Sequence, residues 1–153
     1  MKKTSLINLL LFTFLLTLHV QTALAIQMVA VDNDNVNMRS GPGLNEKVLW
    51  KLSQGFPLKV LKTSGKWLHV QDFEGSKGWV HKNVVNRSGH MIVRAQKDGG
   101  KINIRSKPDT RSKVVAQAYY GVVFKTLQQR KGWVKVRHDN VTGWIKRTLL
   151  WGF

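Results

Sequence analysis

The sequence predicts an all-β protein that contains two small barrels in tandem. Three observations support this prediction. Most of the chain is written twice, its apolar and polar residues alternate in short runs, and Gly-containing turns separate those runs. After residue 25, no stretch keeps the 3.6-residue period of a helix for three turns.

The repeat is clearest at its start. The heptad "NMRSGPG" at 37–43 returns as "NIRSKPD" 66 residues later, at 103–109. The closing "GWV" of the first copy meets "GWI" of the second at an offset of 65, because the second copy is one residue shorter in a loop. Two units, 36–85 and 102–151, are the simplest account of these matches.

Each unit contains five short alternating runs, which we expect to be strands. In the first unit they cover 36–39, 47–52, 56–63, 67–71 and 78–82. In the second they cover 102–105, 113–117, 122–128, 132–137 and 143–147. Five strands in about 50 residues predict a bent barrel, because an open sheet would leave faces and edges unprotected. The run "MIVRA" at 91–95 predicts a lead strand for the second barrel, with Asp98-Gly99-Gly100 as its turn.

Apolar residues at matched positions predict the two cores. The pairs are Val36/Ile102, Met38/Ile104, Val48/Val114, Leu61/Leu127, Val70/Val136 and Val80/Ile145. The large residues that such small cores need are the pairs Trp67/Trp133 and Trp79/Trp144. Each Trp can bury about 150–250 Å² of surface.

The first 25 residues predict a signal peptide. A basic start, "MKK", precedes the apolar run 6–20 and the small-x-small site "ALA" at 23–25. This run is shorter than the roughly 20 residues of a membrane-spanning helix, and no later stretch is long and apolar enough to be one. We therefore expect export to the periplasm or the medium, with cleavage after Ala25, and two domains at 26–87 and 88–153.

The chain is strongly basic, with a formal net charge of +17. Loss of Lys2 and Lys3 with the signal peptide would leave 23 basic residues against 8 acidic ones, or +15. This excess favours anionic partners, although it also serves solubility alone. The chain has no cysteine, which excludes disulfides and thiolate metal sites, so packed cores must supply the stability.

No catalytic or metal-binding constellation is apparent, so we expect no enzyme activity, no metal and no cofactor. Cysteine nucleophiles are absent, and the histidines at 69, 81, 90 and 138 lack any tight ligand spacing. The acidic stretch "DNDN" at 32–35 lacks the Gly and the distant Glu of a calcium loop, and it predicts a polar turn instead.

The order of motifs in each unit resembles the bacterial Src-homology-3-type domain. The first unit, "VNMRSGPGLNEKVLWKLSQGFPLKVLKTSGKWLHVQDFEGSKGWVHKNVV", carries its N-x-R-x-G-P-G opening, central Gly turn, G-x-W strand and closing G-W-V strand. The layout and the ending "LLWGF" resemble exported tandem versions. The resemblance implies a binding module, often for peptidoglycan or its stem peptides. Arg39 and Arg105 are expected to brace the first loop, and the change from "GPG" to "KPD" predicts that the second loop differs in shape or ligand preference.

Two groups of residues are candidates for contact with a partner. The ligand-binding candidates are Asn37, Trp50, Phe73, Trp79, Asn103, Tyr119, Tyr120 and Trp144. The aromatic rings that lack a matched core partner could instead fill the interface between the barrels. The anion-binding candidates are Lys125, Arg130, Lys131, Lys135, Arg137, Lys146 and Arg147. They lie in the more basic second unit, and they could equally form a solvated face.

Three functions remain open. The first is a non-catalytic cell-envelope module that binds peptidoglycan or its stem peptides. The second is a periplasmic adaptor that binds an envelope protein, and the third is binding to a polyanion, either anionic lipid or nucleic acid. The predicted signal peptide argues against nucleic acid.

Overall fold

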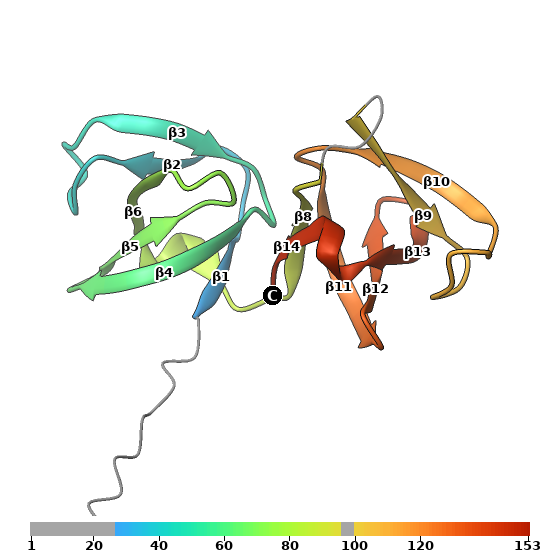
Figure 1. Ribbon diagram of the computed structural model, residues 1–153. Coiled ribbons are helices and arrows are strands. Elements are labelled where there is room, and N and C mark those ends of the chain that lie inside the picture. The colour runs from blue at the N-terminus through green and yellow to red at the C-terminus, as the bar shows by residue number, and fades with distance from the viewer. Residues whose placement is uncertain (1–26, 96–99) are drawn as a thin grey trace, which may run out of the picture.

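The computed structural model describes residues 27–95 and 100–153. The predicted signal peptide, 1–25, and Asp98 and Gly99 of the predicted turn lie outside the described residues. Figure 1 shows two β-rich bodies side by side, with the C-terminus between them. Each body is a seven-stranded antiparallel sheet, so the prediction of an all-β chain with two barrels in tandem is confirmed.

The first sheet has the strand order β3-β2-β6-β5-β4-β1-β7. Its strands are β1 (Met28–Val31), β2 (Val36–Arg39), β3 (Val48–Leu52), β4 (Pro57–Ser64), β5 (Trp67–Gln71), β6 (Lys77–His81) and β7 (Val85–Asn86). A 3-10 turn, η1 (Lys82–Val84), joins β6 to β7. The polar turn predicted at 32–35 lies between β1 and β2, and Asn35 adopts a positive φ of 60° there.

The second sheet repeats this order as β10-β9-β13-β12-β11-β8-β14. Its strands are β8 (His90–Val93), β9 (Lys101–Arg105), β10 (Val114–Tyr119), β11 (Val123–Arg130), β12 (Trp133–His138), β13 (Val141–Lys146) and β14 (Leu150–Gly152), with η3 (Arg147–Leu149) before β14. Among the described residues, no helix is long and apolar enough to cross a membrane.

Each sheet contains two more strands than the five expected per unit. The predicted lead strand is confirmed as β8, which pairs with β11 and β14. Its counterpart β1 pairs with β4 and β7 in the same way, but the sequence analysis did not predict it. The repeat hides β1, because its residues do not match β8 at the offset that aligns the rest of the units. The strands β7 and β14 are too short to alternate visibly.

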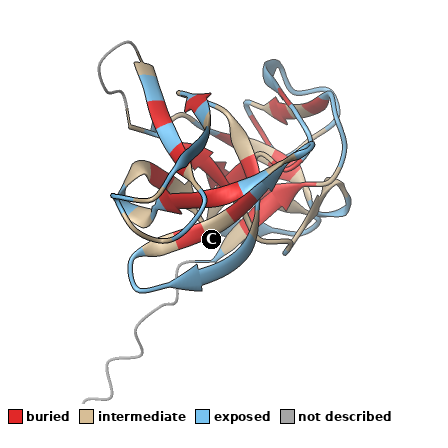
Figure 2. Cartoon of the chain, turned by 90° about the vertical axis from the view of Figure 1, so that its right-hand side faces the viewer, coloured by how far each residue is buried: buried red, intermediate tan, exposed pale blue. Residues whose placement is uncertain are grey.

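Each barrel has its own hydrophobic core (Figure 2). Four of the predicted pairs are buried on both sides, so those predictions are confirmed: Val36/Ile102, Met38/Ile104, Val70/Val136 and Val80/Ile145. The lead strands add Val29 and Val31 to the first core, and Met91 and Val93 to the second. The two barrels are thus separately packed units that share one pattern of core residues.

Two predicted core pairs are wrong. Leu61 and Leu127 are 37% and 42% exposed, and Val48 and Val114 are 37% and 39% exposed. The register between β4 and β5 shifts between Val60 and Lys62, so Leu61 is the extra residue of a β-bulge. Leu127 occupies the matching bulge of β11. A bulge interrupts the alternation of faces, and the leucine therefore points to solvent.

Of the four Trp residues expected in the cores, one is buried and three are only half-buried. Trp144 is buried, at 8% exposure, as predicted. Trp67, Trp79 and Trp133 are only half-buried and do not belong to either core cluster. The cores close with aliphatic side chains and Phe124, which leaves these three rings on the barrel surfaces.

Aromatic residues connect the two barrels. The ring of Phe73, in the β5–β6 loop, lies 5.2 Å from that of Tyr120 and 5.9 Å from that of Phe56. The Tyr120 hydroxyl donates a hydrogen bond of 2.8 Å to Glu74 Oε1. For Phe73 and Tyr120, the structure therefore favours the interface role that the sequence left open.

Candidate functional site

Each barrel carries a small groove, and the two grooves are equivalent. The first has a volume of about 250 Å³ and is lined by Asn35, Val36, Asn37, Arg39, Leu44, Trp67, His81 and Val84. The second, of about 160 Å³, is lined by Lys101, Ile102, Asn103, Arg105, Thr110, Trp133, Lys146 and Leu149. Every position in one list has its repeat counterpart in the other. The duplication has therefore preserved a surface feature as well as a core.

An asparagine on the opening strand lies at the wall of each groove, but its hydrogen bonding differs between the barrels. In the second barrel, Gln117 Nε2 donates to Asn103 Oδ1 across a distance of 3.0 Å. In the first, Lys51 occupies the cross-strand position of Gln117, and Asn37 Oδ1 is buried without a partner among the described residues. An unsatisfied buried polar atom costs about 1–3 kcal/mol. The first groove therefore has unused hydrogen-bonding capacity.

A half-buried Trp forms the aromatic part of each groove. The His81 ring lies 5.1 Å from the Trp67 ring in an edge-on arrangement. In the second barrel, Lys146 replaces His81, and its Nζ lies 5.9 Å from the Trp133 ring centroid. A cation near an aromatic face attracts anionic groups while the ring packs on apolar ones. The second groove is thus the more basic of the two.

The loop beside each groove is held by an arginine, as the sequence predicted. Arg39 Nη1 donates to the Glu46 carbonyl oxygen at 2.8 Å, and Arg105 Nη1 donates to the Ser112 carbonyl oxygen at 2.7 Å. These charge-assisted hydrogen bonds fix the loop against the strand that carries the asparagine. Because both arginines also line the grooves, they connect loop shape to groove shape.

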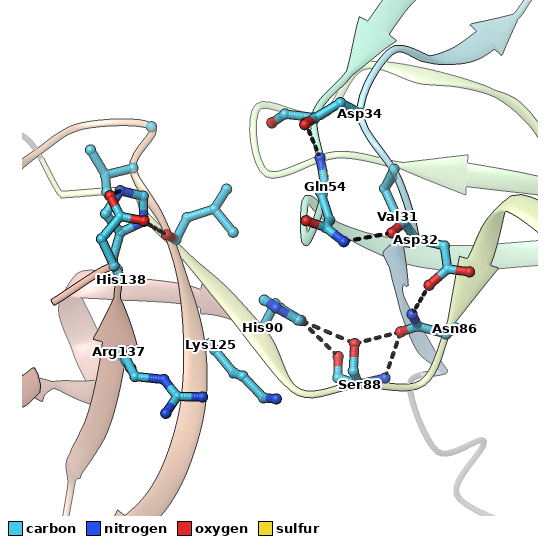
Figure 3. Close-up of a pocket in the computed structure, with 15 residues that line it drawn as sticks. Val31, Asp32, Asp34, Gln54, Asn86, Ser88, His90, Lys125, Arg137 and His138 are labelled. Carbon is cyan, nitrogen blue, oxygen red and sulfur yellow. Dashed lines mark hydrogen bonds and ion pairs between the residues drawn. The ribbon is translucent and has the colours of Figure 1, made fainter. Parts of the chain in front are cut away.

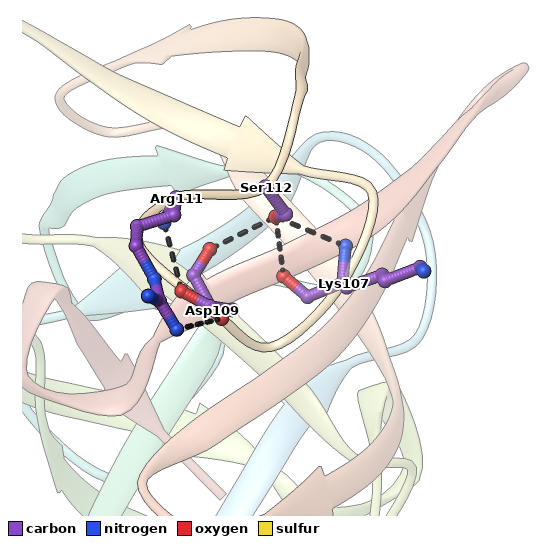
Figure 4. Close-up of polar contacts among 4 residues, drawn as sticks. All are labelled: Lys107, Asp109, Arg111 and Ser112. Carbon is purple, nitrogen blue, oxygen red and sulfur yellow. Dashed lines mark hydrogen bonds and ion pairs between the residues drawn. The ribbon is translucent and has the colours of Figure 1, made fainter.

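The two loops share a backbone hydrogen-bonding pattern, so a difference in shape at this level is not observed. The amides of Gly43 and Asp109 donate to the carbonyl oxygens two residues earlier, at 3.0 and 2.8 Å. The side chains differ. Ser40 Oγ donates to the Glu46 carboxylate in the first loop. In the second, the Ser112 hydroxyl lies within 2.9 Å of two carbonyl oxygens of the loop, as Figure 4 shows.

In the second loop, the aspartate of the "KPD" sequence stabilises the turn through its side chain. Asp109 Oδ1 accepts a hydrogen bond of 2.8 Å from the Arg111 amide, and Asp109 Oδ2 lies 3.5 Å from Arg111 Nη2 (Figure 4). These contacts replace the glycines of "GPG" with an Asp-centred turn. At Gly41 of the first loop, a Cβ would lie 2.6 Å from Glu46 Cδ, so a side chain there would displace the exposed Glu46 carboxylate.

We expect the Arg105→Gln substitution to loosen the second loop without unfolding its barrel. The substitution removes a charge-assisted hydrogen bond to Ser112, and such bonds contribute about 1.5–3 kcal/mol when desolvated. Amide hydrogen exchange at Asp109 and Ser112 should therefore accelerate, while exchange in β12 stays slow. The Lys107→Gln variant provides the control, because its exposed side chain braces nothing in the described loop. Equal exchange in both variants would contradict the bracing role.

The remaining aromatic candidates lie outside the two grooves. Trp79 packs on His69, with 4.9 Å between ring centroids, and lies 5.4 Å from Lys62 Nζ. Trp50 and Tyr119 are each 56% exposed, on the terminal strands of the two sheets. Trp144 contributes to neither groove. The structure therefore brings only Asn37 and Asn103 of the ligand candidates into the grooves.

The basic candidates spread over several parts of the second barrel. Lys146 lines its groove, whereas Lys125 and Arg137 line a larger groove between the barrels. Arg147 is held by hydrogen bonds of 2.9 and 3.2 Å to the Leu150 and Gly152 carbonyl oxygens, so it stabilises the C-terminal turn. The other three candidates lie along the β11–β12 hairpin, at Arg130, Lys131 and Lys135.

Two titratable groups have pKa values that respond to these contacts. The hydrogen bond from Tyr120 to Glu74 raises the pKa of the Tyr120 hydroxyl, so the interface keeps this group neutral. Burial against Trp79, followed by repulsion from Lys62 and Lys77, lowers the pKa of His69. Neither group lies in the small grooves. Within 27–95 and 100–153, no cluster of three potential ligands could hold a metal ion.

The groove position of Trp67 and Trp133 differs from the core position that the sequence predicts. Trp67 and Trp133 match across the repeat, and matched aromatic residues were assigned to the cores for that reason. The available signal was their position directly after the turns "GK" and "KG", at the start of strands whose next residues, Leu68 and Val134, face the core. Alternation along a strand then places the Trp on the outer face.

Comparison with known families agrees with this architecture, and the chain belongs to the bacterial SH3 domains. One family model, described as "Bacterial SH3 domain", matches residues 32–86. A second model with the same description matches residues 100–150. Each match lies within one of the two barrels, so the tandem arrangement of Src-homology-3-type domains is confirmed.

Similar curated proteins include two that are named as amidases. The chain is 27% identical over 122 residues to "Putative N-acetylmuramoyl-L-alanine amidase YrvJ" of Bacillus subtilis, which covers 75% of this chain and 24% of that protein. It is 38% identical over 48 residues to "Probable cell wall amidase LytH" of Staphylococcus epidermidis, covering 31% of this chain and 16% of that protein. The chain thus spans about a quarter or less of these relatives.

Solved structures with some similarity include NlpC2 from Trichomonas vaginalis and the endolysin LysPBC5 CBD. The first has a TM-score of 0.38 at 14% identity and covers 84% of this chain and 48% of that chain. The second has a TM-score of 0.33 at 15% identity and covers 82% of this chain and 92% of that chain.

Proposed function

We propose that this chain is an exported, non-catalytic cell-envelope module that recognises peptidoglycan through its stem peptides, with 26–87 and 88–153 as its two binding domains. The observation that carries the proposal is that one groove recurs at the same positions of both barrels, with its asparagine, arginine and tryptophan unchanged. Structural constraints preserve core residues, whereas an outward-facing groove gains most from a shared ligand. The wall amidases among the similar proteins support the same compartment and the same polymer.

The chemistry of the grooves suits a short peptide. An indole face packs on the small side chains and methylene groups of a stem peptide. The side-chain amides of Asn37 and Asn103 can pair with peptide N–H and C=O groups, since each amide is both donor and acceptor. Lys146 would attract the carboxylates that stem peptides carry. The second groove would therefore favour acidic positions.

We infer a binding role without catalysis. The titratable side chain lining the first groove is His81, and its Nδ1 already contacts Asn83 Oδ1. The hydroxyl group that lines the second groove is that of Thr110. Its charged neighbours in the groove are cationic, and no described side chain there could act as a base. We assign the activity in the names of the amidase relatives to the parts of those proteins that this chain does not match.

The test is co-sedimentation of residues 26–153 with purified peptidoglycan sacculi across a salt series. Binding should persist at about 0.5 M salt, where the Debye length is only about 4 Å. We expect the double substitution Trp67→Ala/Trp133→Ala to weaken binding at least tenfold, because buried aromatic contacts dominate interface energies. The exposed Trp50→Ala variant is the control and should bind normally.

The milder Asn37→Ala substitution separates a binding defect from a folding defect. It removes an amide that makes no described hydrogen bond, so thermal stability should stay the same or rise. Binding by the first barrel should still fall severalfold. The proposal fails if binding disappears at moderate salt, or if the double Trp variant remains folded and binds as well as the unmodified protein.

A protein-adaptor role is the second candidate, and one observation favours it. The strands β3 and β10 end the strand order of their sheets, and each exposes large apolar residues. Trp50 and Leu49 are 56% and 39% exposed on β3, and Tyr119 and Val115 are 56% and 43% exposed on β10. Terminal strands of this kind accept an added strand from a partner. Loss of a saturable protein complex on Trp50→Lys substitution, with sacculus binding intact, would support this role.

A further inference from the structure

A third groove, larger than the two on the barrels, lies between them. It has a volume of about 820 Å³ and combines residues from β1 and its following turn, from the linker, and from β11 and β12. Figure 3 shows its two walls, with Asp32, Asp34 and Gln54 on one side and Lys125 and Arg137 on the other. The first barrel thus supplies an acidic wall, and the second supplies a basic one.

The basic wall contains two like charges that face each other across a strand pair. Lys125 on β11 and Arg137 on β12 are direct Cα partners. Like charges directly opposite each other destabilise a sheet. Neither side chain has an ion pair or side-chain hydrogen bond within the described part of the chain. An anion between the two cations would remove this repulsion.

The acidic wall holds two carboxylates that are oriented but not saturated. Asp34 Oδ1 accepts a hydrogen bond of 2.9 Å from the Gln54 amide. Asp32 Oδ1 accepts one from Asn86 Nδ2 at 2.5 Å. These bonds fix both side chains at the groove, and each carboxylate keeps its second oxygen free of contacts to the described residues. Two free carboxylate oxygens provide acceptors for an ammonium group.

The linker forms a fixed floor between the walls (Figure 3). The Ser88 amide donates to Asn86 Oδ1 at 2.9 Å, and Ser88 Oγ lies 3.2 Å from His90 Nδ1. This chain of hydrogen bonds runs from the acidic wall to the start of β8. On the basic side, His138 lies next to Asp139, with 3.5 Å between Nε2 and Oδ2, so this acid is turned toward a histidine of its own hairpin. The two walls therefore carry opposite charge, and the floor between them is held in place by hydrogen bonds.

We propose that the inter-barrel groove binds a zwitterionic peptide segment. Its carboxylate lies between Lys125 and Arg137, and its ammonium group lies at the acidic wall that Asp32 and Asp34 form. A purely anionic ligand would meet the two carboxylates, and a purely cationic one would meet the two bases. Only a ligand with both charges matches both walls. The choice of a wall peptide as this ligand rests on the proposed function, whereas the charge requirement rests on the groove alone.

The test uses residues 26–153 and the synthetic tripeptide L-Ala-γ-D-Glu-meso-diaminopimelate, in which the free amine of the Ala residue and a free carboxylate of the last residue lie at opposite ends. Binding is measured by calorimetry for the free peptide, for a form acetylated on that amine, and for a form amidated on that carboxylate. We expect each capped form to bind at least tenfold more weakly, since each loses a charged hydrogen-bonding partner.

Two double variants test which wall binds the carboxylate of the peptide and which binds its ammonium group. In the Lys125→Gln/Arg137→Gln variant, amidation of the peptide should no longer matter, while acetylation still should. The Asp32→Asn/Asp34→Asn variant should show the reverse, and it keeps the Oδ1 acceptors that hold Gln54 and Asn86. The matched control is Arg130→Gln/Lys135→Gln, which removes two charges from the same hairpin outside the groove and should leave both effects intact.

Failure of this proposal is distinguishable from failure of the proposed function. Equal binding of all three peptides, or a control variant that loses the same selectivity, would overturn the zwitterion site even if sacculi are bound. Absence of any binding to the free peptide would also overturn it. Charge-selective binding of the peptide by a chain that does not bind sacculi would retain the groove and reject the proposed function.

Discussion

We expect the Gly143→Ala substitution to lower the free energy of unfolding of the second barrel by about 3 kcal/mol, at the upper end of the cost of overpacking a core. A Cβ at this position would lie 2.6 Å from Ile104 Cγ2 and 2.9 Å from the Arg105 carbonyl oxygen. The side chain belongs to the core, and the carbonyl belongs to β9, whose pairing with β13 passes through Arg105. Movement of the Arg105 carbonyl group to relieve this contact would therefore separate β9 from β13.

The equivalent Gly78 should tolerate alanine better, although its distances look similar. Its Cβ would lie 2.6 Å from Met38 Cγ and 3.0 Å from the Arg39 carbonyl oxygen. Methionine has three rotatable bonds and can move aside, whereas the branched side chain of Ile104 cannot. The two substitutions thus compare a flexible obstacle with a stiff one at the same place in the fold.

Urea denaturation followed by hydrogen exchange in each barrel would measure both effects. Gly89→Ala is the control, because a Cβ there would lie 3.5 Å from Thr126 Cβ, an ordinary contact distance. It should change the free energy of unfolding by less than about 0.5 kcal/mol. If Gly143→Ala were no more costly than Gly89→Ala, the close packing of β13 on β9 would be wrong.

The repeat made most of the fold predictable. A residue that is apolar in both copies at one position usually faces the core, as Met38 and Ile104 do. The same logic failed for Trp67 and Trp133, because a shared groove preserves aromatic residues as effectively as a shared core. Matching across two copies detects a common constraint, but it does not say whether that constraint is packing or binding.

The inter-barrel groove could not be predicted from the sequence. Lys125 and Arg137 were candidates from the charge of the second unit, but their position opposite Asp32 and Asp34 depends on how the barrels contact each other. That contact involves Phe73 of one copy and Tyr120 of the other, whose repeat counterparts are not aromatic. An interface between two copies uses the residues in which the copies differ.

The bulges were the other feature that alternation could not reveal. A strand with regular alternation that includes Leu58 and Val60 would place Leu61 on the opposite face from Val60 and leave no extra residue. The shift in register between Val60 and Lys62 shows that Leu61 is that extra residue. The bulge recurs in β11 at Leu127, so it is part of the fold and not an accident of one copy.

A pair of leucine substitutions on β4 tests the burial of Leu58 and the exposure of Leu61 directly. We expect Leu58→Ala to cost about 2–5 kcal/mol, because Leu58 is fully buried and its removal leaves a cavity in a small core. Leu61→Ala should cost less than about 1 kcal/mol, since this side chain is 37% exposed at the bulge and packs against solvent on one side. The measurement is the free energy of unfolding of the first barrel in urea.

The two leucines lie three residues apart on one strand and lose the same atoms, so each substitution controls for the other. Strand propensity and side-chain chemistry are matched, and only the burial differs. Equal costs would mean that Leu61 is as buried as Leu58, as its match to Leu127 across the repeat predicted. A large cost confined to Leu58 would confirm that Leu61 lies on the outside of the barrel, as it does in the register in which Val60 pairs with Val70 and Lys62 with His69. That register also sets where β5 begins, and hence where Trp67 stands at the edge of the first groove.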